Sequence, residues 1–303
     1  MIYKEWLNEW LELYIKVSTK ERTYMKYRRQ AEKYILPVLG EYEMDELSAV
    51  RLQGFSASLI EKGLAASTVN GVLFVLKSSL KKATALGIAH QQFTDAIVRP
   101  KAREKKVVCF NKDEQKKIER YVLEHNTPYL FGIALSLYTG LRIGELLALT
   151  WEDIDFQNGT MTISKSCFDS WENGHYKKVF DTTKTQSSER VIPLPKQLIG
   201  ELKQLKKQTC GRFVVAAKSE YGAQIRAYQR SFGLVLEKLH IERKGFHALR
   251  HTFATRALEV GMDVKTLSEI LGHQNPTITL NRYAHSLLEH KTEMMNKVGR
   301  LYG

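Results

Sequence analysis

The chain has little of what marks a secreted, metal-binding or membrane protein. Its only cysteines, Cys109, Cys167 and Cys210, lie far apart and are odd in number. This spacing fits neither a disulfide framework nor a zinc site, and we predict reduced thiols. Apolar runs such as YLFGIALSLY are shorter than the roughly 20 residues that a membrane span needs. The charged N-terminus MIYKEWLNEWLELYIK is unlike a signal peptide, so we expect a cytoplasmic protein without a membrane partner.

Acidic residues are too few to balance the charge of the chain. The 303 residues contain 33 acidic and 46 basic side chains, which gives a net charge of +13. A surplus of this size suggests a polyanionic partner, and in the cytoplasm that partner is usually nucleic acid. Charge alone leaves open a soluble basic protein without such a partner.

The segment RPKAREKK, residues 99–106, separates two helical regions and carries five basic residues and one acidic residue. Pro100 disfavours helix at the preceding residue, and the like charges favour an extended, solvated chain. We predict an interdomain linker here, and an ordinary solvated linker is the simplest form of it. Its basic residues are also candidates to follow a DNA backbone: Arg99, Lys101, Arg103, Lys105 and Lys106.

Residues 1–98 have the pattern of a small bundle of four or five helices. Trp6, Trp10, Leu13 and Tyr14 share one face of a first helix. We expect later helices over about 23–36, ending at Pro37, over 47–60, and from an N-cap at Ser67. The tryptophans are predicted to be core residues rather than groups that stack on bases.

Residues 107–303 form a longer, mainly helical region with one β-rich interruption. GTMTISKS and YKKVFDTTKTQSSERVIPL alternate apolar and polar residues, as strands do. The prediction is therefore an all-α domain over 1–98, followed by a mainly α domain with a small β-sheet (α+β) over 107–303.

Two arginine motifs lie in the second region. In TGLRIGELLAL, Glu145 follows Arg142 by three positions, a spacing at which a carboxylate orients a guanidinium. In HALRHTFATRALEVG, His247 and Arg250 are also three apart on a predicted helix. An arginine that forks two phosphate oxygens, beside an imidazole that moves a proton, suits a phosphodiester. Taken alone, the first motif favours a structural ion pair.

The stretch LGHQNPTITLNRYAH, residues 271–285, contains His273 at a helix end. Asn275 and Pro276 suit the start of the next helix. By pattern alone, Tyr283 in that helix is a core residue. A tyrosine hydroxyl has a pKa of about 10, so it attacks phosphorus only where cations favour the phenolate. Two arginines, two histidines, a candidate lysine and this tyrosine together suit metal-free phosphoryl transfer to a side-chain oxygen.

TGLRIGEL, TKTQSSERVIPL, HALRHTFATRALEVG and LGHQNPTITLNRYAH occur in the order and at the spacing of one known family. The chain resembles the tyrosine recombinase (phage integrase) family over nearly its whole length, and residues 1–98 resemble that family's helical core-binding (SAM-like) domain. The resemblance implies a C-shaped clamp on double-stranded DNA and no metal or nucleotide cofactor.

The resemblance also implies roles for individual residues. Arg142 and Arg250 would hold the scissile phosphate, and Tyr283 would attack it to form a 3′-phosphotyrosyl link. Lys184 would be the general acid; its TKT context favours it over Lys177 and Lys178. His247 would assist proton transfer, His273 would hydrogen-bond a phosphate oxygen, and Glu145 would orient its neighbours.

The tail, residues 286–303, carries an apolar helical stripe made of Leu287, Leu288, Met294, Met295, Val298 and Leu301. The resemblance implies that the tail packs on a neighbouring protomer in a homotetramer, although folding back on its own domain is the alternative. We expect the tetramer to exchange strands at inverted-repeat core sites through a Holliday junction, with a possible accessory DNA-bending or directionality factor. We expect it at the bacterial nucleoid.

The helical region begins almost at Met1, which leaves no room for an arm-binding domain. We therefore expect a two-domain recombinase that integrates or excises a mobile element. A DNA invertase or a Xer-like resolvase is the runner-up. A type IB topoisomerase and a non-catalytic DNA-binding protein are the alternatives from other classes.

Overall fold

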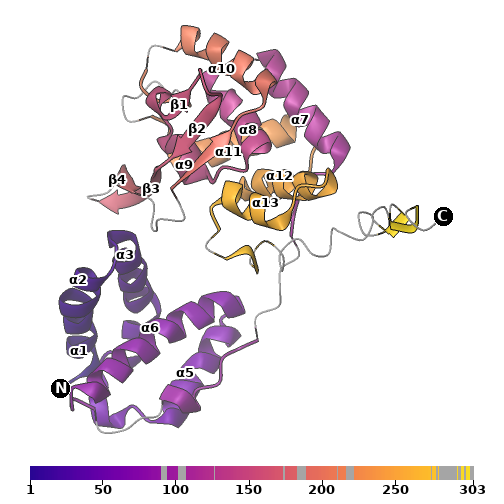
Figure 1. The fold of residues 1–303 in the computed structure, drawn as a ribbon. Helices are drawn as coiled ribbons and strands as arrows, with labels where there is room; N and C mark the ends of the chain where they lie inside the picture. Colours follow the sequence, from indigo (N-terminus) through magenta and orange to yellow (C-terminus); the bar gives the residue numbers. More distant parts are fainter. Residues whose placement is uncertain are drawn as a thin grey trace. The chain divides into compact units, whose positions relative to one another are not determined.

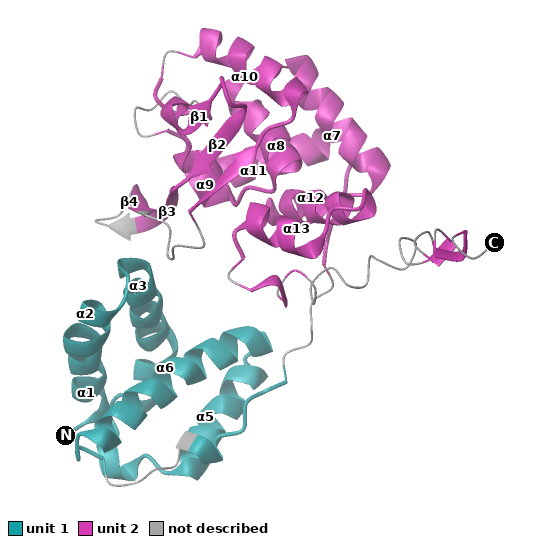
Figure 2. Cartoon of the chain, in the orientation of Figure 1, with its two compact units in different colours: residues 1–105 teal, residues 106–303 magenta. Residues whose placement is uncertain are grey.

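The chain divides into two compact units, residues 1–105 and 106–303, in a computed structural model (Figure 2). The structure describes residues 1–89, 94–101, 107–125, 127–172, 175–182, 189–209, 211–215, 222–273, 275–277, 279, 292, 295–296 and 298–300. Each unit has its own hydrophobic core.

The regular elements described in the first unit are all helices (Figure 1). Its α-helices are α1 (Tyr3–Trp10), α2 (Lys16–Ser18), α3 (Glu21–Gln30), α4 (Leu36–Leu39), α5 (Ala49–Glu61) and α6 (Ala66–Ala85). Trp6 and Trp10 are buried, and the Trp6 indole donates to the Ser79 carbonyl of α6 at 3.0 Å. The predicted all-α bundle and the assignment of both tryptophans to its core are confirmed.

Two π-helical turns interrupt the first pair of long helices. Leu11–Ile15 joins α1 to α2, and Ala31–Ile35 joins α3 to α4. Each π-turn adds one residue to a hydrogen-bonded turn and so rotates the residues beyond it. Leu13 is therefore 59% exposed rather than on the core face. The helix also continues through Pro37 to Leu39, because Pro37 lies in the first turn of α4, where no N–H is needed.

The start of α6 also differs from the prediction. The helix begins at Ala66, with Ala65 rather than Ser67 at the N-cap position.

Residues 97–100 lie along the first unit. The Val98 N–H donates to Gln53 of α5 at 2.9 Å, and the Asn70 side chain of α6 donates to the Pro100 carbonyl at 3.0 Å. Arg99 and Lys101 are exposed. Arg103, Lys105 and Lys106 lie outside the described residues, so the linker and its DNA contacts stay a prediction.

The second unit combines seven described α-helices with short antiparallel strands. The helices are α7 (Lys112–His125), α8 (Pro128–Thr139), α9 (Ile143–Ala148), α10 (Lys196–Gln208), α11 (Ile225–Lys238), α12 (His247–Glu259) and α13 (Val264–Leu271). The strands are β1 (Ile154–Asp155), β2 (Thr160–Ile163), β3 (Lys165–Glu172), β4 (His175–Thr182) and β5 (Arg190–Pro193). They form one sheet in the order β1-β2-β5 and a separate β3-β4 hairpin. The predicted α+β class is confirmed.

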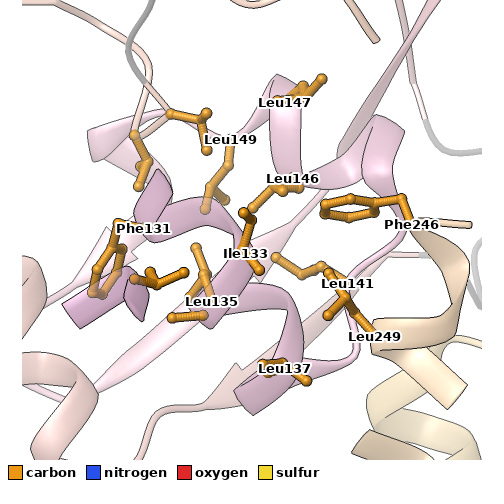
Figure 3. Packing of buried hydrophobic residues seen from close by; sticks show 14 of the residues in the cluster. Phe131, Ile133, Leu135, Leu137, Leu141, Leu146, Leu147, Leu149, Phe246 and Leu249 are labelled. Atoms are coloured by element: carbon orange, nitrogen blue, oxygen red, sulfur yellow. The ribbon is translucent and has the colours of Figure 1, made fainter. Parts of the chain in front are cut away.

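Helix α8 is the centre of this unit. Its apolar side chains leave no polar face, so the helix is buried on all sides. Its Phe131, Ile133, Leu135 and Leu137 belong to one cluster with Leu146 and Leu147 of α9 and Leu249 of α12, all labelled in Figure 3. Burial of one such side chain contributes about 1.5–3 kcal/mol. This packing holds the start of α9 and the face of α12 beside the end of α8.

Candidate active site

Arg142 lies at the N-cap position of α9, two residues after Gly140 ends α8. The Glu145 carboxylate accepts the Arg142 backbone N–H at 3.0 Å and the Arg142 Nη1 at 2.8 Å. The sequence spacing of three therefore gives the expected ion pair. Arg142 Nη2 also donates to the Gly272 carbonyl at 3.2 Å. The Arg142 side chain remains 37% exposed, so it is accessible from solvent.

Arg250 lies on α12 and is only 2% exposed. Its Nη1 donates to the Gly140 carbonyl at 2.9 Å, and its Nη2 donates to the Leu271 carbonyl at 2.7 Å. Both acceptors are at helix ends, where carbonyls lack partners within the helix. Arg250 thus ties the end of α8 to the end of α13.

His273 directly follows Gly272, the left-handed residue that ends α13. Its Nε2 lies 2.8 Å from Arg250 Nη2, and its Nδ1 lies 2.7 Å from the Thr279 hydroxyl. Because a guanidinium only donates, Nε2 must accept, and the proton of the neutral ring is on Nδ1. The geometry therefore fixes the tautomer of His273.

His247 is the first residue of α12 and is exposed, unlike Arg250 three positions later. Its ring meets the His251 ring edge to face, with centroids 4.5 Å apart. The Asn275 side chain accepts the Thr277 N–H at 2.9 Å, so the predicted cap after His273 is present.

Arg190 on β5 belongs to the same cluster, and our sequence reasoning missed it. Its Nη2 lies 2.9 Å from Glu145 Oε2, its Nη1 lies 3.2 Å from Oε1, and its Nε donates to the Ile270 carbonyl at 2.6 Å. The sequence of β5 did contain a signal that could have identified Arg190. Arg190 and the buried Ile192 are two positions apart and so share a face, which makes Arg190 a charge on the inward side.

The two arginines strongly perturb the ionisation of Glu145. Burial alone would raise the pKa of its carboxyl, but the hydrogen bonds and charge of Arg190 lower it. With the added charge of Arg142, the pKa of Glu145 falls to about 2. Glu145 is therefore ionised in the folded protein near neutral pH.

Lys184 and Tyr283 lie outside the described residues, and their predicted roles are not placed by the structure. Strand β4 ends at Thr182, two residues before Lys184 in the sequence. Of the competing lysines, Lys178 is buried and donates to the Leu147 carbonyl at 2.8 Å. Its ammonium lies over the rings of Phe180 and Phe213, and burial lowers its pKa. The Lys178 ammonium thus makes its contacts inside the protein.

The described cluster suits a tetrahedral oxyanion. Two arginines and a histidine from α9, α12 and the end of α13 come together, and guanidinium groups bind such oxygens in fork geometry. Within the described ranges, no group of three or more histidine, cysteine, aspartate or glutamate side chains is arranged to hold a metal. Among the helices in those ranges, none has the length and apolar character of a membrane span.

Comparison with known proteins identifies the family. Residues 96–290 match the model of the phage integrase family, and residues 2–60 match the phage integrase N-terminal SAM-like domain. A XerC-like tyrosine recombinase of Caldanaerobacter subterraneus is 29% identical, over 98% of this chain and 82% of that protein. The transposase of transposon Tn916 from Enterococcus faecalis is 24% identical, over 95% of this chain and 77% of that protein.

Solved structures have the same fold. The integrase of the Tn1549 transposon, bound to transposon right-end DNA, superposes with a TM-score of 0.82 at 23% identity and covers 99% of this chain and 100% of that chain. A lambda integrase tetramer bound to a Holliday junction superposes with a TM-score of 0.71 at 18% identity, over 91% of this chain and 79% of that chain.

The chain belongs to the phage integrase family. It is a tyrosine recombinase, a DNA strand transferase that carries out site-specific recombination. The family and the activity predicted from the four motifs are confirmed.

Proposed function

We propose that Arg142, Arg250 and His273 form the cradle for the scissile phosphate and that Tyr283 is the nucleophile. The convergence of these three side chains at the end of α13 carries the proposal. Two guanidinium groups stabilise the negative charge that grows on the non-bridging oxygens in the transition state. His273 Nε2 now accepts from Arg250, so it must exchange that contact and carry a proton before it donates to a phosphate oxygen.

The proposed chemistry combines this cradle with Tyr283, Lys184 and His247. The Tyr283 hydroxyl oxygen attacks phosphorus, the bond from phosphorus to the 5′ oxygen breaks, and a 3′-phosphotyrosyl ester forms. Lys184 gives its proton to the departing 5′ oxygen, and His247 assists the proton transfer from the tyrosine. Because the ester keeps the energy of the phosphodiester, a 5′-hydroxyl from another strand reverses the step and joins the strands.

The biological setting that we propose is integration or excision of a mobile element. Several relatives are transposon enzymes, including the Tn916 transposase, and ICEBs1 integrase of Bacillus subtilis is 24% identical over 94% of this chain. A DNA invertase or a Xer-like resolvase stays the runner-up, because the relatives also include a XerC-like tyrosine recombinase and a shufflon-specific DNA recombinase of Escherichia coli, the latter 26% identical over 94% of this chain.

We also propose that the protein clamps double-stranded DNA as a homotetramer through its tail, with core sites in inverted repeat. Of the apolar stripe in the tail, Met295 and Val298 are described and exposed, at 67% and 41%. Exposed apolar groups of this kind are available to a second copy. Lys101 and the other basic residues of 99–106 would follow the phosphate backbone, and an accessory bending factor fits this assembly.

Covalent capture tests the proposed nucleophile. Nicked fragments of the source genome are incubated with the wild-type protein or with Tyr283→Phe, the mixture is denatured, and DNA that stays on the protein is sequenced. We expect attachment at one or a few inverted-repeat sites for the wild type and none for Tyr283→Phe. DNA binding by both proteins, measured by gel shift, is the control.

Other outcomes would contradict the proposal in different ways. Attachment spread over all sequences would indicate a topoisomerase-like activity. Attachment that persists in Tyr283→Phe would mean that another side chain is the nucleophile. Intact DNA binding without any attachment would indicate a binding protein without strand transfer.

A further inference from the structure

The C-terminal end of α13 is capped by arginine side chains. The last carbonyls of an α-helix have no donors within the helix. Here the Gly272 N–H donates to the Glu269 carbonyl and the His273 N–H to the Ser268 carbonyl, both at 3.0 Å. The next three carbonyls, those of Ile270, Leu271 and Gly272, accept from Arg190, Arg250 and Arg142 respectively, at 2.6, 2.7 and 3.2 Å.

These three arginines come from three different elements, β5, α12 and the start of α9. The negative end of a helix dipole stabilises cations, so it helps to hold three like charges at one place. Two of these arginines are the proposed phosphate clamps. The third, Arg190, has no role in the proposed chemistry.

Arg190 is built into the protein rather than presented to DNA. Its side chain is 6% exposed, against 37% for Arg142. Its two Nη atoms face the two oxygens of Glu145, which is itself 4% exposed. It also lies against Gly272, where an added Cβ would be 2.9 Å from Arg190 Nη1.

We propose that Arg190 is a positioning residue for the phosphate cradle, acting through Glu145 on Arg142 and through the end of α13 on His273. This inference rests on the proposed role of Arg142 as a phosphate clamp. A buried carboxylate needs a partner charge. With Arg190 in place, Glu145 is neutralised from the inside and orients Arg142. Without the Arg190 fork, the two Glu145 oxygens are no longer both held from the inside, and the carboxylate draws the Arg142 guanidinium inward, away from the phosphate.

The test compares cleavage of two DNA substrates in single turnover. One has a normal scissile phosphodiester, and the other has an uncharged methylphosphonate at that position. A loss of phosphate clamping lowers cleavage of the charged substrate most, because the neutral one develops less negative charge. A general structural defect lowers cleavage of both substrates alike.

Three variants make the comparison. Arg142→Ala removes the clamp, and Arg190→Lys keeps a positive charge but loses the fork. Arg256→Lys is the matched control, because Arg256 also pairs with a carboxylate, Glu259, and donates to a carbonyl, that of Phe110 at 3.0 Å. We expect Arg142→Ala and Arg190→Lys to lower the cleavage rate of the phosphodiester roughly 100-fold or more. On the methylphosphonate, the loss of rate should be about one tenth as large. Arg256→Lys should cleave both substrates at the wild-type rate.

The outcomes distinguish a failure of the proposed role of Arg190 from a failure of the proposed role of Arg142. Equal losses on both substrates for Arg190→Lys, with Arg142→Ala showing the expected difference, would overturn the role of Arg190. No difference between the substrates for Arg142→Ala would overturn the clamp assignment itself, and the inference with it. If Arg190→Lys does not fold, Arg190→Gln takes its place, because its amide keeps a hydrogen-bond donor beside Glu145 and leaves Glu145 itself unchanged; the same preference for the neutral substrate is expected.

Discussion

Glu145 is one carboxylate shared by two guanidinium groups, and this makes its ionisation part of the stability of the second unit. The folded-state pKa of about 2 is below the ordinary value of 4.5. A lowered carboxyl pKa stabilises the fold at pH values above the unfolded pKa, and this stabilisation disappears as pH falls through the folded pKa. The shift corresponds to about 3 kcal/mol.

We therefore expect the stability difference between wild type and Glu145→Gln to be constant above about pH 5. It should shrink between about pH 4.5 and pH 2, as Glu145 takes up a proton. Urea unfolding of the second unit, followed by circular dichroism at each pH, measures the difference. A difference that stays constant down to pH 2.5 would show that Glu145 titrates normally.

At this same scale, the sequence predicted the site well where the motif was a pair of side chains. Arg142 with Glu145 and the Asn275 cap lie as their spacing indicated. Arg190 was missed because neither of its two acceptor residues, Ile270 and Glu145, lies near it in the sequence. Its acceptors are the Ile270 carbonyl and a carboxylate 45 residues away, and backbone acceptors leave no mark in a sequence.

At the scale of elements, the ends of helices position the site. Gly140 ends α8 with φ +67°, and its carbonyl accepts from Arg250. A Cβ at Gly140 would be 2.6 Å from Phe253 and 2.7 Å from Leu271. The glycine is therefore required both by backbone conformation and by the close approach of α12 and α13.

Gly140→Ala tests this requirement. A left-handed non-glycine residue costs roughly 1–2 kcal/mol, and overpacking adds about 1–3 kcal/mol. The control is Gly261→Ala, which has φ +91° but nothing within 4 Å of its Cβ, so only the backbone cost applies. We expect Gly140→Ala to lose more unfolding free energy in urea and also to lose cleavage. Equal losses for the two variants would exclude the packing requirement.

The elements themselves were predictable to different degrees. The α+β class and the strand segments followed from alternation, because one face of β2 and β5 is buried. The π-turns at Leu11–Ile15 and Ala31–Ile35 did not follow from the sequence. A pattern that repeats every 3.6 residues carries no sign of one inserted residue, and so Leu13 was placed on the wrong face.

For the whole molecule, the charge of +13 makes salt a direct probe of DNA contact. Each phosphate contact that is lost lowers the slope of log K against log salt by about 0.9. We expect Arg99→Ala/Lys101→Ala to lower the slope by about 2, with equal effects on all DNA sequences. The control removes two exposed lysines of α10, Lys203 and Lys207, because α10 contributes no residue to the site. An unchanged slope in Arg99→Ala/Lys101→Ala would show that residues 99–101 do not touch DNA.

The arginine cap of α13 also determines which positions of the sequence tolerate substitution. Its three acceptors are main-chain carbonyls, which every amino acid provides. Mutational scanning should therefore find that positions 270 and 271 accept other apolar side chains, whereas the three donors and Gly272 accept almost nothing. The arginine cap therefore tolerates substitution at two of its acceptors, Ile270 and Leu271, but not at Gly272 or at its three donors.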